Sequence, residues 1–150
     1  MRVLHYVDEN NLTWRESWRL LLCKLKEFGV ESIVVCRPGG TLSKYLQDCG
    51  LTTIEYKPLL PALPCMAFGF ASVIDKVCPD VIHTRLSSAA LIGGWWGKRK
   101  NIPVASTVDK HAKMKYYWNA DMILPCSRAV ADHMQAQGCQ SAKTKVVYNP

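Results

Sequence analysis

The residues best suited to chemistry follow predicted strands. Asp109 and His111 come after the apolar run 103–107, where a carboxylate or an imidazole can position a hydroxyl group or transfer a proton. Arg85 comes after the run 81–84, where a guanidinium can bind a phosphate or carboxylate through two parallel hydrogen bonds. The alternatives are a helix N-cap for Asp109, an exposed residue without a role for His111, and a surface salt bridge for Arg85.

Further basic and hydroxyl residues follow the same kinds of strand ends. Lys110 and Lys113 would form an anion-binding site with Arg85, and a solvated charged surface is the alternative. Ser127 is predicted to be a helix N-cap, and with Arg128 it opens a helix whose free amides can also hold a phosphate. For His83, within a buried strand, we favour a hydrogen-bonded structural role.

Several motifs for other chemistry are missing from the sequence. The loop at residues 8–12 has no glycine, which argues against the G-x-G-x-x-G turn of NAD- or FAD-binding proteins. The seven cysteines contain no C-x-x-C pair, so we predict no metal site and a reducing compartment. The amino-terminal residues do not have the layout of a signal peptide, and no apolar run is long enough to span a bilayer. A cytoplasmic location is therefore expected.

Short apolar runs alternate with segments of helical periodicity along the whole sequence. This alternation predicts an α/β fold, with a doubly wound, mostly parallel sheet and helices on both faces. A T-x-x-E capping box is expected at Thr13 and Glu16, before the first helix. The expected strands are 2–7, 31–36, 52–56, 81–84, 103–107, 122–124 and 145–148, and the expected helices are 14–28, 41–49, 67–77, 87–100, 112–118 and 127–137.

Charge and apolar residues are unevenly distributed over the 150 residues. The net charge is +7, and residues 98–150 hold nine Lys or Arg against three acidic residues. The proline-broken stretch 59–70 is apolar, and it can be read as a lipid-facing patch or as the floor of an acceptor groove. Together with the basic last third, it would suit peripheral docking on the inner face of an anionic cytoplasmic membrane.

From Pro79 to Pro150 the sequence resembles the N-terminal half of a GT-B glycosyltransferase of family 4. The pieces PDVIHTR, SSAALIGGWWGKRKNIPVASTVD, ADMILPCSRAVADHM and KVVYNP follow one another in the family's order, and VDKHAKMKYYW is similar to members that act on lipopolysaccharide or other envelope glycans. The resemblance implies a Rossmann-like, acceptor-side domain over residues 1–150 of a retaining enzyme. We expect no cofactor in this domain.

The resemblance also implies a partner, a C-terminal domain that binds the sugar-nucleotide donor and carries a Glu-x₇-Glu signature. That signature is absent, so the 150 residues are expected to end at a domain boundary and to be inactive alone. Two positions depart from the family. Asn10 and Asn11 replace the Gly-Gly pair of the donor-phosphate loop, and Asp109 replaces the family histidine, with His111 two residues later.

Whether Asp109 or His111 takes over that role is left open, as are the sugar and the acceptor. The alternative function is a stand-alone basic α/β module that binds nucleic acid or an anionic glycan, which the net charge favours weakly. No helix-turn-helix or RNP-type pattern supports nucleic-acid binding.

Overall fold

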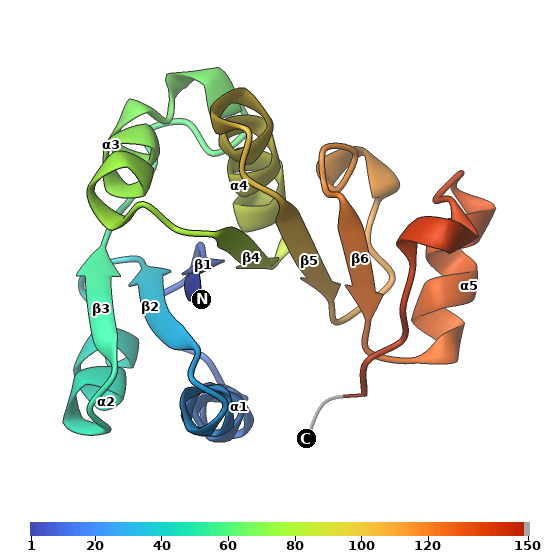
Figure 1. The fold of residues 1–150 in the computed structure, drawn as a ribbon. Helices are drawn as coiled ribbons and strands as arrows, with labels where there is room; N and C mark the ends of the chain where they lie inside the picture. The colour runs from blue at the N-terminus through green and yellow to red at the C-terminus, as the bar shows by residue number, and fades with distance from the viewer. Residues whose placement is uncertain (149–150) are drawn as a thin grey trace.

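The computed structural model describes residues 1–148, which fold around a six-stranded parallel sheet (Figure 1). The strand order is β3-β2-β1-β4-β5-β6, and each neighbouring pair is parallel. The prediction of a doubly wound α/β fold is confirmed. The strands are β1 (Arg2–Val7), β2 (Glu31–Cys36), β3 (Thr52–Glu55), β4 (Val81–Arg85), β5 (Val104–Val108) and β6 (Met122–Pro125).

Helices cover both faces of the sheet. Figure 1 shows α3 and α4 on one face, α1 and α2 on the other, and α5 beside the edge strand β6. The helices are α1 (Arg15–Glu27), α2 (Leu42–Asp48), α3 (Phe68–Val77), α4 (Ser87–Lys100) and α5 (Arg128–Ala136). Three short 3-10 turns are η1 (Pro64–Met66), η2 (Met114–Tyr116) and η3 (Ser141–Lys143).

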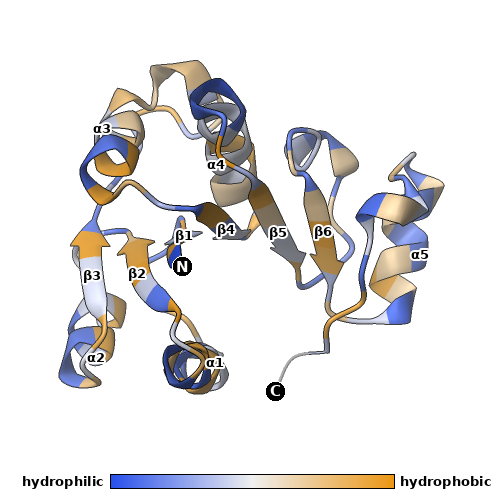
Figure 2. Cartoon of the chain, in the orientation of Figure 1, coloured by the Kyte–Doolittle hydropathy of each residue, from blue (hydrophilic) through white to orange (hydrophobic). Residues whose placement is uncertain are grey.

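Two apolar clusters lie on the two faces of the sheet. Tyr6 of β1 packs with Phe70 of α3 on one face, whereas the next residue, Val7, joins Trp18 and Leu22 of α1 on the other. Alternate side chains of a strand point to opposite faces, and here both faces are covered. This explains why the strands read as continuous apolar runs, visible as the orange segments of Figure 2.

Glycines allow α4 to lie close to the sheet. A Cβ atom at Gly93 would fall 2.4 Å from Cγ2 of Thr84, and one at Gly97 would fall 2.3 Å from Cγ2 of Val104. Both distances are too short for real atoms, so a side chain at either position would push α4 away from β4 and β5. This close packing holds α4 against the sheet, and the amino end of α4 is part of the site described below.

Three local predictions are wrong, each for a physical reason. The capping box does not form, because α1 begins at Arg15 and the carboxylate of Glu16 pairs with Arg19 and Tyr45. The helix predicted at 112–118 shrinks to η2. The carbonyl of Ala112, which would accept the first hydrogen bond of such a helix, is instead contacted by His133 of α5 at 3.0 Å and by Gln137, the C-cap of α5, at 2.9 Å.

The strand predicted at 145–148 is also not a regular strand. The segment runs parallel to β6, where the amides of Lys145 and Val147 donate to the carbonyls of Ile123 and Pro125, at 3.0 and 2.9 Å. Pro125 has no amide hydrogen to donate in return, so the ladder is incomplete.

Candidate functional site

A pocket of about 550 Å³ lies at the carboxyl end of the sheet, beside β1 and β4. The connections from these neighbouring strands leave in opposite directions, and open α/β sheets bind their ligands at such a switch point. The pocket is lined by Asp8, Glu9, Pro61, Ala62, Leu86, Ser87, Ser88, Leu91, Lys110 and Tyr116.

Of the two acidic residues that line the pocket, Asp8 is paired with a basic residue, Arg37. The side chain of Asp8 is fully buried and accepts two hydrogen bonds from Arg37, from Nε at 2.6 Å and from the terminal nitrogen at 2.9 Å. This contact with Asp8 raises the pKa of Arg37. Burial and the nearby Asp8 also raise the pKa of Tyr6, which therefore stays neutral. Glu9 is the other acidic residue that lines the pocket.

The loop after β1 is held against the loop after β2. The side-chain amide of Asn10 donates to the carbonyl of Pro38 at 3.1 Å, and Oδ1 of Asn11 accepts from the amide of Thr41 at 3.0 Å. A Cβ atom on Gly40 would fall 2.2 Å from the carbonyl oxygen of Asn10, so this approach requires glycine. Both asparagines thus serve contacts within the protein, and a role at a donor phosphate stays a prediction.

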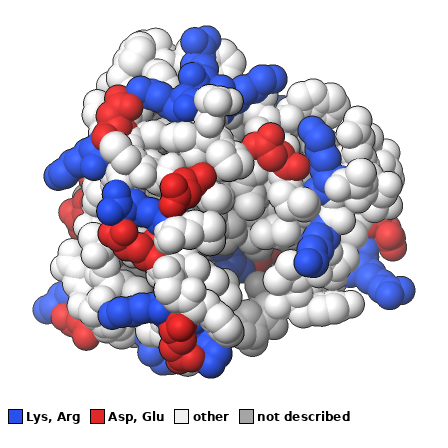
Figure 3. Space-filling view, viewed as in Figure 1, with Lys and Arg blue, Asp and Glu red and all other residues white. Residues whose placement is uncertain are grey.

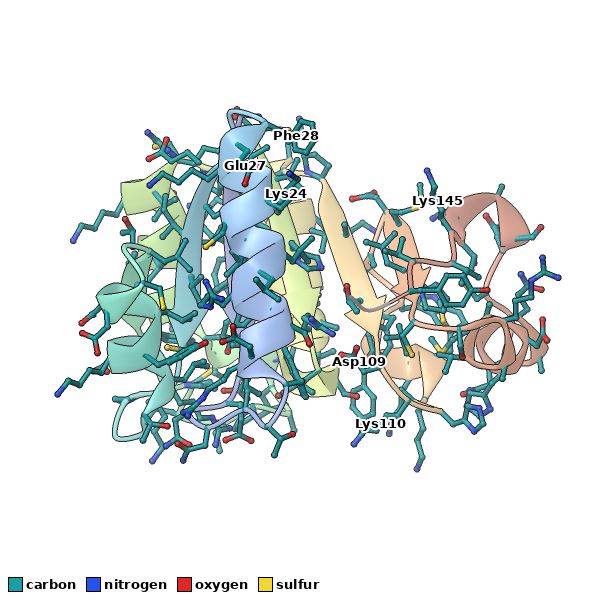
Figure 4. All side chains as sticks on the ribbon, turned by 90° about the horizontal axis from the view of Figure 1, so that it is seen from below. Lys24, Glu27, Phe28, Asp109, Lys110 and Lys145 are labelled. Atoms are coloured by element: carbon teal, nitrogen blue, oxygen red, sulfur yellow. The ribbon has the colours of Figure 1, made fainter. Side chains whose placement is uncertain are left out.

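Asp109 and Arg85 form an ion pair beside the pocket. The guanidinium donates to Asp109 at 2.5 and 3.2 Å, and it stacks on the ring of Trp14 at 4.0 Å from the ring centre. Arg85 is only 4% exposed. Asp109 therefore holds Arg85, and the N-cap residue of the following helical turn, η2, is Lys113. Figure 4 shows Asp109 and Lys110 together at the end of the sheet to which β5 points.

The residues after β5 point in different directions. Lys110 lines the pocket, whereas the exposed His111 stacks on His133 of α5, with ring centres 4.6 Å apart. Lys113 is exposed at the start of η2. Of the residues predicted to bind an anion, Lys110 is the one that lines this pocket. The catalytic role of Asp109 or His111 stays a prediction.

Ser127 and Arg128 lie at the start of α5 and do not line this pocket. The amide of Val130 donates to Oγ of Ser127 at 3.3 Å, which confirms the predicted N-cap. Arg128 is the first helical residue and is exposed. Phosphate binding at this helix end stays a prediction.

A chain of hydrogen bonds crosses the sheet beneath α1. Nδ1 of His5 lies 3.0 Å from Nδ1 of His83, and the outer ring nitrogens contact Ser32 at 3.2 Å and Thr107 at 2.8 Å. Burial and the neighbouring His83 lower the pKa of His5 well below 6.5. Burial and the nearby Arg85 lower the pKa of His83 to about 4, against the opposing effect of Asp109. The hydrogen-bonded structural role predicted for His83 is confirmed.

Several pocket residues were not singled out from the sequence. Ser87 and Ser88 begin α4 after Leu86, whose φ of 74° is unusual for a residue with a side chain. Their position directly after β4 could have indicated a role in ligand binding, because parallel sheets bind ligands at the carboxyl ends of their strands. Pro61 and Ala62 reach the pocket from the long connection between β3 and α3, within the stretch 59–70 that the sequence offered as a lipid-facing patch or as the floor of an acceptor groove.

The sequence model of Glycosyltransferase Family 4 matches residues 17–150. The chain belongs to Glycosyltransferase Family 4. Its fold is similar to that of HepE from Anabaena, solved with UDP-glucose, at a TM-score of 0.79 and 16% identity, covering 99% of this chain and 44% of HepE. It is also similar to the lipopolysaccharide outer core galactosyltransferase WaaB in its apo form, at a TM-score of 0.80 and 14% identity, covering 100% of this chain and 46% of WaaB.

A glycosyltransferase from Rickettsia africae is similar at a TM-score of 0.76 and 21% identity, covering 98% of this chain and 42% of that enzyme. The family 4 chain thus spans less than half the length of these solved structures. A comparison with curated proteins gives no match. Within residues 1–148, no helix is long and apolar enough to cross a membrane, and no three His, Cys, Asp or Glu side chains are grouped to hold a metal ion.

Proposed function

We propose that this chain is the acceptor-binding half of a retaining glycosyltransferase. The complete enzyme would transfer a sugar from a sugar-nucleotide to a glycan or glycolipid acceptor, in the synthesis of lipopolysaccharide or another envelope polysaccharide. The family supports transfer of a sugar, and the likeness to WaaB, named as a lipopolysaccharide galactosyltransferase, favours an envelope acceptor. The observation that carries the acceptor role is the pocket at the switch point of the sheet.

The lining of the pocket suits a polyhydroxylated acceptor. Glu9 can accept hydrogen bonds from sugar hydroxyls, Lys110 can donate them, and the hydroxyl groups of Ser87 and Ser88 can do either. Leu91 lies on an apolar part of the wall, which suits the C–H face of a sugar ring. In this scheme the chain binds and orients the acceptor, and Asp109 and His111 remain the candidate catalytic residues.

The proposal includes a second domain. A C-terminal domain would bind the sugar-nucleotide opposite this pocket, so the 150-residue chain would be inactive alone. Incubating the chain with UDP-glucose and an oligosaccharide acceptor should give no transfer product, measured by mass spectrometry. Turnover would overturn this part of the proposal. A cytoplasmic location with peripheral attachment to the membrane belongs to the same proposal.

Acceptor binding can be measured on the chain itself. We expect core oligosaccharides of lipopolysaccharide to shift the amide NMR signals of residues around the pocket. Lys110→Ala should weaken that binding, because it removes a donor from the lining. Lys145→Ala is the matched control, since Lys145 is exposed and lies away from Lys110 (Figure 4). Equal weakening by both variants would contradict the site. Tight binding of single-stranded DNA instead would favour the basic binding module.

A further inference from the structure

A second hollow, of about 300 Å³, lies at the opposite end of the sheet from the candidate acceptor pocket. The segments before β5 and before β6 line it, whereas the acceptor pocket lies where β1 and β4 end. Two smaller hollows, of about 280 and 140 Å³, adjoin it, because each shares lining residues with it. We call the three hollows the distal groove. Its central hollow is lined by six polar or aromatic side chains: Lys98, Asn101, Trp118, Asn119, Asp121 and Lys143.

Trp118 gives the groove an exposed aromatic wall. It is 65% exposed, although tryptophan is mostly buried in folded proteins. It lines both the central hollow and the hollow of 140 Å³. The flat face of an indole can pack against the C–H face of a sugar ring, and the N–H group at its edge can donate a hydrogen bond to a hydroxyl. A sugar ring is therefore a fitting ligand for this wall.

The charged groups of the central hollow suit a sugar that carries a phosphate. Lys98 and Lys143 are both exposed there, and lysine binds phosphate through charge-assisted hydrogen bonds. Asn101, Asn119 and Asp121 can pair with sugar hydroxyls, because amides donate and accept and a carboxylate accepts. Figure 3 shows lysine and arginine side chains gathered at the top of the view, where α4 ends (Figure 1). We infer that the distal groove binds a phosphorylated glycan.

The fold holds the walls of the central hollow in place. The amide of Asp121 donates to the carbonyl of Val104 at 2.9 Å, and Oδ2 of Asp121 accepts from the amide of Val104 at 2.8 Å. A Cβ atom on Gly94 would fall 3.0 Å from Cβ of Asn119, so α4 lies directly against the segment before β6. A site that is formed before its ligand arrives loses less entropy on binding.

Two features favour a glycan over a single-stranded nucleic acid. Nucleic acids of this kind stack successive bases on several aromatic side chains. Two tryptophans line the groove, but the guanidinium of Arg99 covers the ring of Trp95, at 4.5 Å from its centre, so Trp118 is the better stacking surface. The carboxylate of Asp121 would also repel the phosphate that every nucleotide carries, whereas a glycan can place a hydroxyl there.

The size of the hollows favours a chain of sugars. Ligand pockets commonly have volumes of about 300–1,000 Å³, so the central hollow suits one sugar ring with its phosphate and is small for a sugar-nucleotide. The adjoining hollows can take neighbouring units of the chain, which favours a glycan over a free sugar phosphate. Binding here does not depend on the proposed transferase function, since the groove and the acceptor pocket lie at opposite ends of the sheet.

The test is an NMR titration of the isotope-labelled chain with mannopentaose phosphate, with mannopentaose and with mannose-6-phosphate. We expect mannopentaose phosphate to shift the indole signal of Trp118. It should bind about tenfold more tightly than either other ligand, because mannopentaose lacks the hydrogen bonds to the charged group and mannose-6-phosphate lacks the chain.

Two variants locate the binding site. Lys143→Ala should weaken binding of mannopentaose phosphate by about tenfold, because a hydrogen bond between charged groups is lost. Trp118→Ala should also weaken it and should remove the indole signal that shifts. Both residues are exposed, so neither change should disturb the fold. Lys145→Ala is the matched control, since Lys145 is an exposed lysine two positions away that lines none of the three hollows.

Four results would overturn the inference: no binding of mannopentaose phosphate, equal binding of mannopentaose, equal losses in Lys143→Ala and Lys145→Ala, or tighter binding of a single-stranded oligonucleotide in the groove. Equal binding of mannose-6-phosphate would overturn the glycan chain as the ligand and assign the groove to a free sugar phosphate. Lys110→Ala changes the acceptor pocket and should leave binding in the distal groove unchanged. Failure of the groove and failure of the acceptor pocket are therefore separate results.

Discussion

The buried pair His5 and His83 should make the protein lose stability as the pH falls. Both imidazoles have a pKa below 6.5 in the folded protein, and that of His83 is about 4. The unfolded chain binds protons on both rings near pH 6.5, whereas the folded protein does not. Unfolding therefore takes up protons below that pH, and the free energy of unfolding decreases as the pH is lowered. The loss begins near pH 6.5 and, for His83, continues to about pH 4.

The size of the effect follows from the pKa of His83. Between the unfolded and the folded pKa values, each unit by which the pH falls lowers the free energy of unfolding by about 1.4 kcal/mol. His83 alone should therefore lower the free energy of unfolding by about 2 kcal/mol between about pH 7.5 and pH 5. His5 adds a loss in the same direction. The two Nδ1 atoms are 3.0 Å apart, and two protonated rings cannot keep the hydrogen bond between them.

The assay is urea unfolding, followed by circular dichroism at several pH values. His83→Gln removes one titrating ring and should cut the pH-dependent loss by about half, whatever it does to stability at neutral pH. His111→Gln is the matched control, because His111 is exposed and lies outside this network. The reasoning is refuted if His83→Gln keeps the full loss of the parent chain, or if His111→Gln reduces it as much.

Three further predictions concern stability, each measured as the free energy of unfolding in urea. Gly97→Ala should cost about 1–3 kcal/mol, because its Cβ would lie 2.3 Å from Cγ2 of Val104; an unchanged midpoint would contradict the close packing of α4. Asp8→Asn should lower the free energy of unfolding by about 2–4 kcal/mol, because it leaves Arg37 without its carboxylate partner. A loss as small as that expected for a solvent-exposed ion pair would contradict this prediction. Ser127→Ala should cost about 1 kcal/mol through loss of the N-cap, whereas Ser127→Thr should keep most of it.

Most of the fold was predictable because its elements carry strong local signals. The strands are short apolar runs buried on both faces, and α4 was expected at its observed bounds. The failures lie where tertiary contacts replace local ones. Residues 112–118 have helical periodicity, yet the side chain of Gln137 takes the backbone groups at Ala112 and Met114. Thr13 and Glu16 match a capping box, but Arg19 and Tyr45 bind the carboxylate.

The candidate site was predictable only at the level of strand ends. The parallel sheet brings the loops after β1, β4 and β5 to one edge, and the structure places Lys110 there; anion binding by Lys110 stays a prediction. Which way each side chain points depends on partners far away in the sequence. Arg85 turns to Asp109 and Trp14, and His111 turns to His133. The spacing of residues in the sequence does not predict these side-chain orientations, because each depends on a contact with a residue of another element.

The structure changes what the net charge of +7 implies. At the carboxyl edge, Asp8 is paired with Arg37 and Asp109 with Arg85, and Glu9 and Lys110 both line the pocket. The charges around the pocket therefore largely cancel, which favours an uncharged sugar as the acceptor group that enters it.

Unbalanced cations lie elsewhere, with Lys98 and Arg99 exposed near the end of α4. A basic surface outside the pocket adds nothing to recognition of a neutral sugar inside it, but under the proposed peripheral attachment it would draw the protein to an anionic membrane. Under the proposed function, the pocket and the basic surface would serve two different contacts, with the acceptor and with the membrane. Neutralising Lys98 and Arg99 should for this reason weaken binding to anionic vesicles and leave binding of a neutral glycan in the pocket unchanged. Loss of both together would show that the two contacts are not separate.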